Sequence, residues 1–112
     1  MSEFDPTDIP GQAREQRDKE LRDRLAQETE DEDLKWLMES RRGRRIVWRL
    51  LDRAGVFRLS FDTEPLVMAF REGARNEGLR VLARVHELCP GRYPQMMREM
   101  TDDDRNTDDR AD

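Results

Sequence analysis

Large apolar residues are confined almost entirely to the middle of this chain, and that distribution limits the fold more than any single motif. Residues 34–100 hold 31 of the 39 hydrophobic residues, whereas the two ends together hold only 8. Ordering a residue costs about 1 to 2 kcal/mol of backbone entropy, which segments so poor in apolar surface cannot offset. We therefore expect an acidic, flexible or partly helical segment at 1–31, a folded helical domain at 32–100, and an acidic disordered tail at 101–112.

Formal charge divides the chain in the same way. Residues 1–33 carry a net charge of −7, residues 34–100 carry +6, and residues 101–112 carry −4, so the total of −5 conceals a basic centre between acidic ends. A folded part of this size buries only about 60% of its unfolded surface and is a marginal monomer. We therefore expect self-association or a partner protein.

The first half of the chain predicts three helical stretches. Opposite charges four residues apart support an exposed, partly frayed helix over 12–30. An acidic first turn followed by an apolar face predicts a second stretch over 32–39, and Ser40 and Gly43 indicate a bend or a weak point. Four apolar residues then form a stripe on a helix from Arg44 to Ala54, and Gly55 is placed to end it in a Schellman motif; the stripe consists of Ile46, Val47, Leu50 and Leu51.

The second half predicts two further helices. Asp62 or Thr63 can cap a helix with Pro65 in its first turn, and Pro90 with Gly91 ends that helix near Leu88. Its apolar residues recur at spacings of 3 or 4, which is the helical period. A short last helix follows at 93–100. No segment alternates with the period of a strand, so the fold class is all-α, a small domain of about four helices with mobile charged termini.

The inventory of chemically reactive residues is short. His86 is the only histidine and Cys89 the only cysteine, and a boundary histidine beside a small buried cysteine is the more ordinary interpretation than a catalytic pair. One histidine with scattered carboxylates reaches no known metal-ligand spacing. The sequence RRGRR contains one glycine and follows no strand, so it is no phosphate loop. We expect no enzyme activity, no metal and no cofactor.

An arginine-rich helix face is the strongest candidate for a binding site. Arginine outnumbers lysine 13 to 1 in residues 34–100, and its planar guanidinium suits phosphates, carboxylates and aromatic rings. Such a ridge can contact a nucleic-acid backbone, an acidic protein surface, the acidic ends of this chain, or only solvent. The ridge consists of Arg41, Arg42, Arg45, Arg49 and Arg53, with Trp48 beside it.

A second candidate surface comprises small and flexible residues. Gly73 and Gly78 each cost about 1 kcal/mol within a helix, which indicates close approach by a neighbouring helix or a bend. Methionines near residue 100 form a flexible apolar patch that either covers the core or meets a partner. The candidate interface therefore consists of Gly73, Gly78, Met96, Met97 and Met100.

Several of these motifs together resemble a known family. The carrying motifs are Trp36-Leu37-Met38, Arg42-Gly43-Arg44-Arg45, Trp48-Arg49-Leu50-Leu51, Ala54-Gly55-Val56-Phe57, and Glu72-Gly73 with Arg75-Asn76-Glu77-Gly78. Over about residues 33–100 the chain is similar to the Bbp-nineteen-like phage domain. The resemblance implies a tailed-phage origin and a gene among virion morphogenesis functions, and it supplies no activity or ligand.

The expected function is therefore binding rather than catalysis. The first hypothesis is a minor virion or head–tail assembly component whose partners are phage structural proteins or other copies of the chain. Alternatives are a nucleic-acid-associated protein that uses the arginine ridge, or a modulator of a host protein. No stretch is apolar enough to cross a membrane and the N-terminus lacks the features of a signal peptide. The expected location is the host cytoplasm during infection, or the virion.

Overall fold

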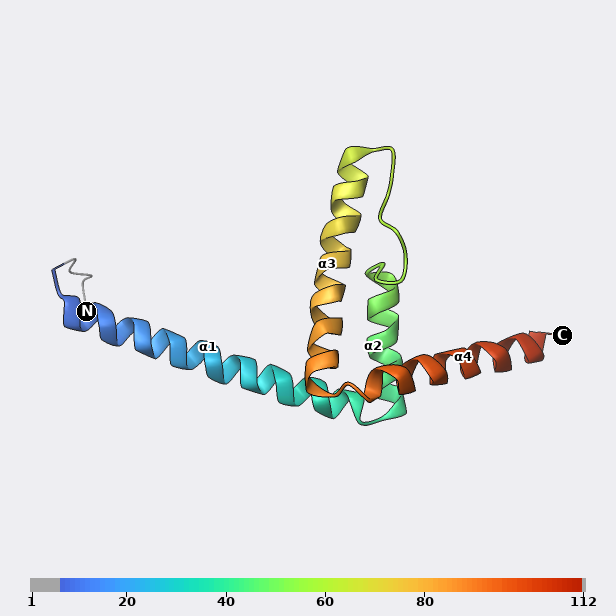
Figure 1. Cartoon of the computed structure of the whole chain (residues 1–112), viewed down its shortest axis with the longest axis horizontal. Helices are drawn as coiled ribbons and strands as arrows, with labels where there is room; N and C mark the ends of the chain where they lie inside the picture. The colour runs from blue at the N-terminus through green and yellow to red at the C-terminus, as the bar shows by residue number, and fades with distance from the viewer. Residues whose placement is uncertain (1–6, 112) are drawn as a thin grey trace. The chain divides into compact units, whose positions relative to one another are not determined.

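The computed structural model describes residues 7–111, with side chains described for residues 7–107. Over this range the chain forms four helices and no strand, which confirms the all-α class (Figure 1). Contacts divide the chain into two compact units, the first ending at Glu32 and the second beginning at Asp33. The helices are α1 (Ile9–Met38), α2 (Arg41–Arg53), α3 (Pro65–Leu88) and α4 (Arg92–Ala111).

Helix α1 joins two stretches that the sequence separates. It runs without interruption from Ile9 to Met38, because no glycine or proline stands between Glu30 and Glu32 to end it. Its first turn includes Pro10 and Gly11, so the helix begins before the stretch predicted over residues 12–30; residues 1–6 lie outside the described range. The Asp8 carboxylate accepts a hydrogen bond from the Gly11 amide at 3.0 Å, which satisfies one of the free donors at the start of a helix.

Helix α2 begins earlier than expected and ends as expected. Ser40 is its N-cap, and the Ser40 hydroxyl accepts a hydrogen bond from the Gly43 amide at 3.0 Å. Gly55 adopts φ 82°, its amide bonds to the Asp52 carbonyl at 3.0 Å, and the Val56 amide bonds to the Leu51 carbonyl at 3.1 Å. These two bonds define a Schellman ending, which confirms that prediction.

Helix α3 has the expected length with a different cap. Pro65 occupies its first turn and Leu88 is its last residue, as predicted. The N-cap is Glu64, whereas the sequence favours Asp62 or Thr63. Asp62 instead accepts a hydrogen bond from the Glu64 amide at 2.8 Å and so stabilises the turn before the helix.

Helix α4 extends into the stretch that the sequence assigns to an acidic tail from Thr101. It continues to Ala111 because no glycine or proline follows Met100. One tail carboxylate is also held by the domain, since Arg41 Nη2 lies 2.6 Å from Asp103 Oδ1. The acidic tail is thus an extension of the last helix.

The core lies where the end of α1, α2, the second half of α3 and the start of α4 meet. The interface expected at the methionines is corrected here, because Met96 and Met100 are buried and Met97 packs against the core. An unbranched, flexible side chain fills the irregular space that such short helices leave. The central buried residues are Met38, Val47, Leu51, Val56, Val85 and Met96.

Two glycines allow helices to approach closely, and a third does not. A Cβ atom on Gly43 would lie 1.7 Å from the Leu37 carbonyl oxygen, so Gly43 is a contact point between α1 and α2. A Cβ atom on Gly78 would lie 2.5 Å from Val56 Cγ2, which places Gly78 in the interior and removes it from the candidate interface. Gly73 faces open space.

Candidate binding site

The structure does not keep the arginine ridge as one uniform surface. Arg42, Arg49 and Arg53 are exposed on α2, whereas Arg45 is half-buried. Arg41 is exposed but paired, since its Nε lies 3.5 Å from Glu99 Oε2 in addition to the contact with Asp103. The free part of the ridge is therefore limited to three exposed arginines and the outer part of Arg45.

The tryptophan beside the ridge is an internal packing residue. Trp48 is half-buried, and its ring stacks on that of Phe57 with centroids 6.3 Å apart and an interplanar angle of 24°. Trp36, by contrast, is 71% exposed. Of the two tryptophans, Trp36 and not Trp48 is available to a partner.

Sequence reasoning missed a buried ion pair at the centre of the domain. Arg44 donates from Nε to Glu99 Oε1 at 2.5 Å and from Nη2 to Oε2 at 3.3 Å, and its Nη1 donates to the Met38 carbonyl at 2.8 Å. One guanidinium thus joins α2, α4 and the C-terminal end of α1. Among four neighbouring arginines, no local pattern distinguishes the one that faces inward.

Part of the expected apolar stripe on α2 faces solvent. Val47 and Leu51 are buried, but Ile46 is 40% exposed and Leu50 is 58% exposed. Helices α3 and α4 contact the face of α2 that carries Val47 and Leu51. The apolar stripe on α2 is wider than the face that these two helices cover. Ile46 and Leu50 consequently lie uncovered beside the exposed arginines.

The first half of α3 extends beyond the end of α2. Gly78 lies against Ala54 and Val56 at the C-terminal end of α2. The part of α3 before Gly78, roughly twelve residues, therefore extends about 18 Å past the end of α2. The linker between α2 and α3 runs alongside this part of α3 (Figure 1). We call residues 57–77 the arm. Its large apolar residues remain exposed by 91%, 74%, 80% and 79% for Leu59, Phe61, Leu66 and Phe70, respectively.

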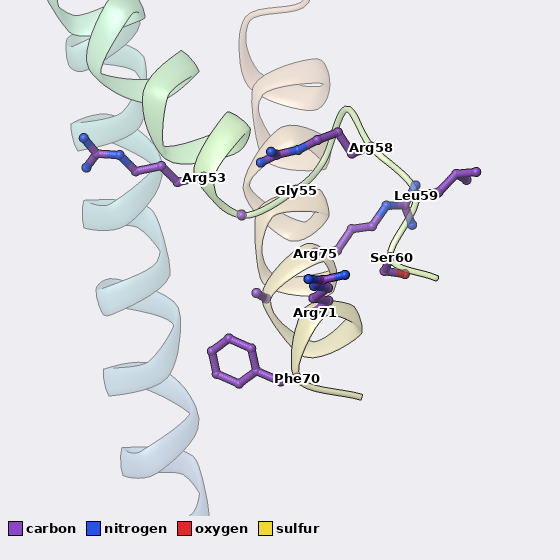
Figure 2. Close-up of a pocket in the computed structure, with 10 residues that line it drawn as sticks. Arg53, Gly55, Arg58, Leu59, Ser60, Phe70, Arg71 and Arg75 are labelled. Carbon is purple, nitrogen blue, oxygen red and sulfur yellow. The ribbon is translucent and has the colours of Figure 1, made fainter. Parts of the chain in front are cut away.

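A cavity of about 370 Å³ lies at the base of the arm, between the linker and α3 (Figure 2). No acidic residue is among the ten that line it. In Figure 2, Arg58, Arg71 and Arg75 lie around this space, while the side chain of Arg53 extends away from them. The lining residues are Arg53, Ala54, Gly55, Arg58, Leu59, Ser60, Phe70, Arg71, Ala74 and Arg75.

The arginines of this cavity have few protein partners. Arg58 donates to the Asp52 carbonyl at the end of α2, and Arg71 Nη1 lies 3.0 Å from Asp62 Oδ2. Arg75 Nε is buried and has no hydrogen-bond acceptor among the residues that the structure describes. A buried donor without an acceptor costs free energy unless a ligand or water satisfies it.

His86 and Cys89 have different surroundings at the end of α3. The His86 ring packs on Tyr93 with centroids 4.8 Å apart. Burial raises the pKa of the Cys89 thiol, and the opposing effects of Arg92 and Lys35 are smaller, so the reactive thiolate is disfavoured. Across residues 7–111, no cluster of three metal-ligating side chains occurs, and none of the helices combines the length and hydropathy needed to cross a membrane.

Comparison with known proteins gives one match. No curated protein and no solved structure shows significant similarity to the chain. The profile of the Bbp19-like phage proteins matches residues 34–98, which include α2, α3, the start of α4 and the buried Arg44. The match spans more than half of the sequence and confirms the resemblance that its motifs indicate. The chain therefore belongs to the family of Bbp19-like phage proteins.

Proposed function

We propose that this phage protein is a non-enzymatic accessory component of the virion or of head–tail assembly, and that it binds another phage structural protein through the arm. The observation that carries the proposal is the set of four large apolar side chains on residues 57–77, each at least 74% exposed. Leu59 and Phe61 lie on the linker, and Leu66 and Phe70 lie on α3. Exposed apolar groups gathered in one segment mark interaction sites more often than isolated ones do.

The arm also suggests what kind of surface the partner presents. Its exposed apolar residues stand beside Arg58, Arg71 and Arg75, so the complementary surface is apolar with an acidic rim. An uncovered helix face of this kind is typically occupied by an amphipathic helix of the partner. A role in binding also accords with the partial burial of Cys89, which disfavours its thiolate.

Mass spectrometry of purified virions tests the proposal. The chain is expected in the particle at a constant copy number. The variant Phe61→Ser/Phe70→Ser should be lost from virions, because it removes two anchors of the arm, while its thermal melt stays near that of the unmodified protein.

The matched control is Leu21→Ser/Leu25→Ser, which changes two exposed apolar residues of α1 outside the arm. This control should still enter the particle. Absence of the unmodified chain from virions, or equal incorporation of the arm variant, would overturn the proposal.

A further inference from the structure

We propose that the arginine cavity at the base of the arm is a binding site for a phosphate monoester, such as a mononucleotide or the phosphorylated end of a nucleic-acid strand. The site shares Arg58, Arg71 and Arg75 with the proposed docking surface, and it goes beyond that function because its ligand is a small anion and not a protein. It also differs from the ridge on α2, because its arginines come from the linker and from α3.

The charge of the cavity favours a dianion. Arg58, Arg71 and Arg75 contribute three positive charges, and the only carboxylate that the structure pairs with them is Asp62, on Arg71. The local formal charge is therefore about +2, which a phosphate monoester of about −1.5 to −2 neutralises and a single carboxylate does not. Arginine is also the residue whose fork matches phosphate oxygens in a bidentate way.

The donors around the cavity are only partly used. Arg75 has a buried Nε without an acceptor among the described residues, and the Arg58 guanidinium is held by a neutral carbonyl at Asp52. Ser60 adds a hydroxyl to the lining. A tetrahedral oxyanion with three outward oxygens would accept hydrogen bonds from several of these groups at once.

The cavity is larger than a phosphate group alone requires. Phe70 is among its lining residues, but its ring lies on the other side of α3 from the Arg75 guanidinium in the view of Figure 2, so it is not placed beside the arginines. The volume of about 370 Å³ falls within the range of small-molecule sites and exceeds what a bare phosphate needs.

Calorimetric titration of the full-length protein at low salt tests the site. The probes are deoxyadenosine monophosphate, deoxyadenosine, inorganic phosphate, acetate, and a ten-nucleotide single strand with or without a 5′-phosphate. We expect one molecule of the monophosphate to bind per chain, at least about tenfold more tightly than deoxyadenosine or acetate.

A pair of double variants separates this site from general positive charge. Arg58→Gln/Arg75→Gln should weaken binding of the monophosphate by about tenfold or more. Arg49→Gln/Arg80→Gln removes the same formal charge from exposed positions outside the cavity, one on α2 and one on α3, and should change the affinity less than about twofold. Circular dichroism melts, together with the single variant Arg75→Gln, show whether any loss of binding reflects loss of folding.

The strand probes identify the source of the phosphate. Tighter binding of the phosphorylated strand than of the mononucleotide assigns the site to a strand end, and weaker binding assigns it to a free nucleotide; both results support the proposal. Equal binding of strands with and without the 5′-phosphate, equal losses in the two double variants, binding of acetate as tight as that of the monophosphate, or no binding of any phosphate probe would overturn it.

Discussion

At the scale of single residues, Arg44 and Glu99 determine how the helices of the domain are joined. Their side chains are 6% and 11% exposed, and they share two hydrogen bonds. Removing one partner of a buried pair leaves the other charge without compensation, whereas replacing both with apolar groups is often neutral. The pair therefore contributes mainly by fixing the arrangement of α1, α2 and α4, and its net contribution to the free energy of unfolding is small.

Glu99→Gln is accordingly expected to lower the free energy of unfolding by about 3 to 5 kcal/mol. Arg42→Gln removes a charge from an exposed neighbour on the same helix and should change it by less than about 0.5 kcal/mol. Urea unfolding followed by circular dichroism measures both. A double variant, Arg44→Met/Glu99→Leu, should recover much of the loss; a Glu99→Gln protein as stable as the parent would contradict the role of the pair.

Substitution by alanine is expected to have opposite effects on stability at Gly43 and at Gly73. Alanine at Gly43 places a methyl group against the Leu37 carbonyl, which is backbone and cannot move aside, so Gly43→Ala should destabilise by about 1 to 3 kcal/mol. Gly73 lies within α3 with open space around it, so Gly73→Ala should stabilise by about 0.5 to 1 kcal/mol. Thermal melts of the two variants provide the measurement. Destabilisation by Gly73→Ala would indicate that a partner or a second copy packs on that face.

Cys89 should react slowly with alkylating reagents, because its thiol is partly buried. Burial raises its pKa above the ordinary value, so at pH about 8.5, where a free cysteine is half thiolate, the folded protein has the smaller thiolate fraction. Iodoacetamide should therefore alkylate the native protein more slowly than the protein in denaturant at that pH, and the difference should shrink as pH rises. Equal rates in the two states would show that Cys89 is neither desolvated nor shielded.

At the scale of elements, the sequence predicts where helices end better than it predicts which helices pack against each other. Gly55, Pro65 and Leu88 mark boundaries through local backbone chemistry, and the structure confirms them. Helix α4 continues past Met100 into the acidic tail, because a helix that begins against the core can extend into residues that carry no apolar surface of their own. The sides of α2 and α3 that remain uncovered depend on where neighbouring helices stop, which no local pattern reports.

The candidate site was less predictable than the fold. The sequence singled out the ridge on α2, but the arginines that line the cavity besides Arg53 come from the linker and α3, where they are separated by up to 17 positions. Their proximity follows from the path of the linker back along α3. The sequence also predicts close approach at Gly78, and Val56 does lie against it. Because Val56 belongs to the same chain, this contact is part of the fold and not of an interface with a partner.

Helix α3 should therefore have two halves of different local stability. Residues after Gly78 pack on the core, including the buried Val85, whereas most large side chains from Leu66 to Phe70 contact solvent. Hydrogen exchange measured residue by residue should give protection factors at least about tenfold lower over residues 68–77 than over residues 79–88. Both stretches belong to one helix, so each serves as the control for the other. Uniform protection along α3 would mean that the arm is covered in solution.

At the scale of the whole molecule, the acidic ends oppose the charge of the domain between them. Residues 34–100 carry +6, and the complete chain carries −5. The tail acts directly at one point, because Asp103 pairs with Arg41 beside the exposed arginines of α2. Acidic groups farther from α2 act on it through a field that is screened over about 10 Å at 0.1 M salt.

Deleting residues 101–112 should consequently strengthen any binding of duplex DNA by α2, because Arg41 is freed and the net charge becomes −1. The affinity of the shortened protein should fall with salt with a log–log slope of about −0.9 for each phosphate contacted. Arg42→Gln/Arg49→Gln should reduce that slope equally for unrelated DNA sequences, since backbone contacts carry no sequence information. Asp103→Asn in the complete chain isolates the contribution of Arg41, because it removes the pair and leaves the other tail charges in place. A shortened protein that does not bind DNA at low salt would leave the exposed arginines of α2 to an acidic protein surface or to solvent, and the cavity at the base of the arm would be the remaining phosphate site.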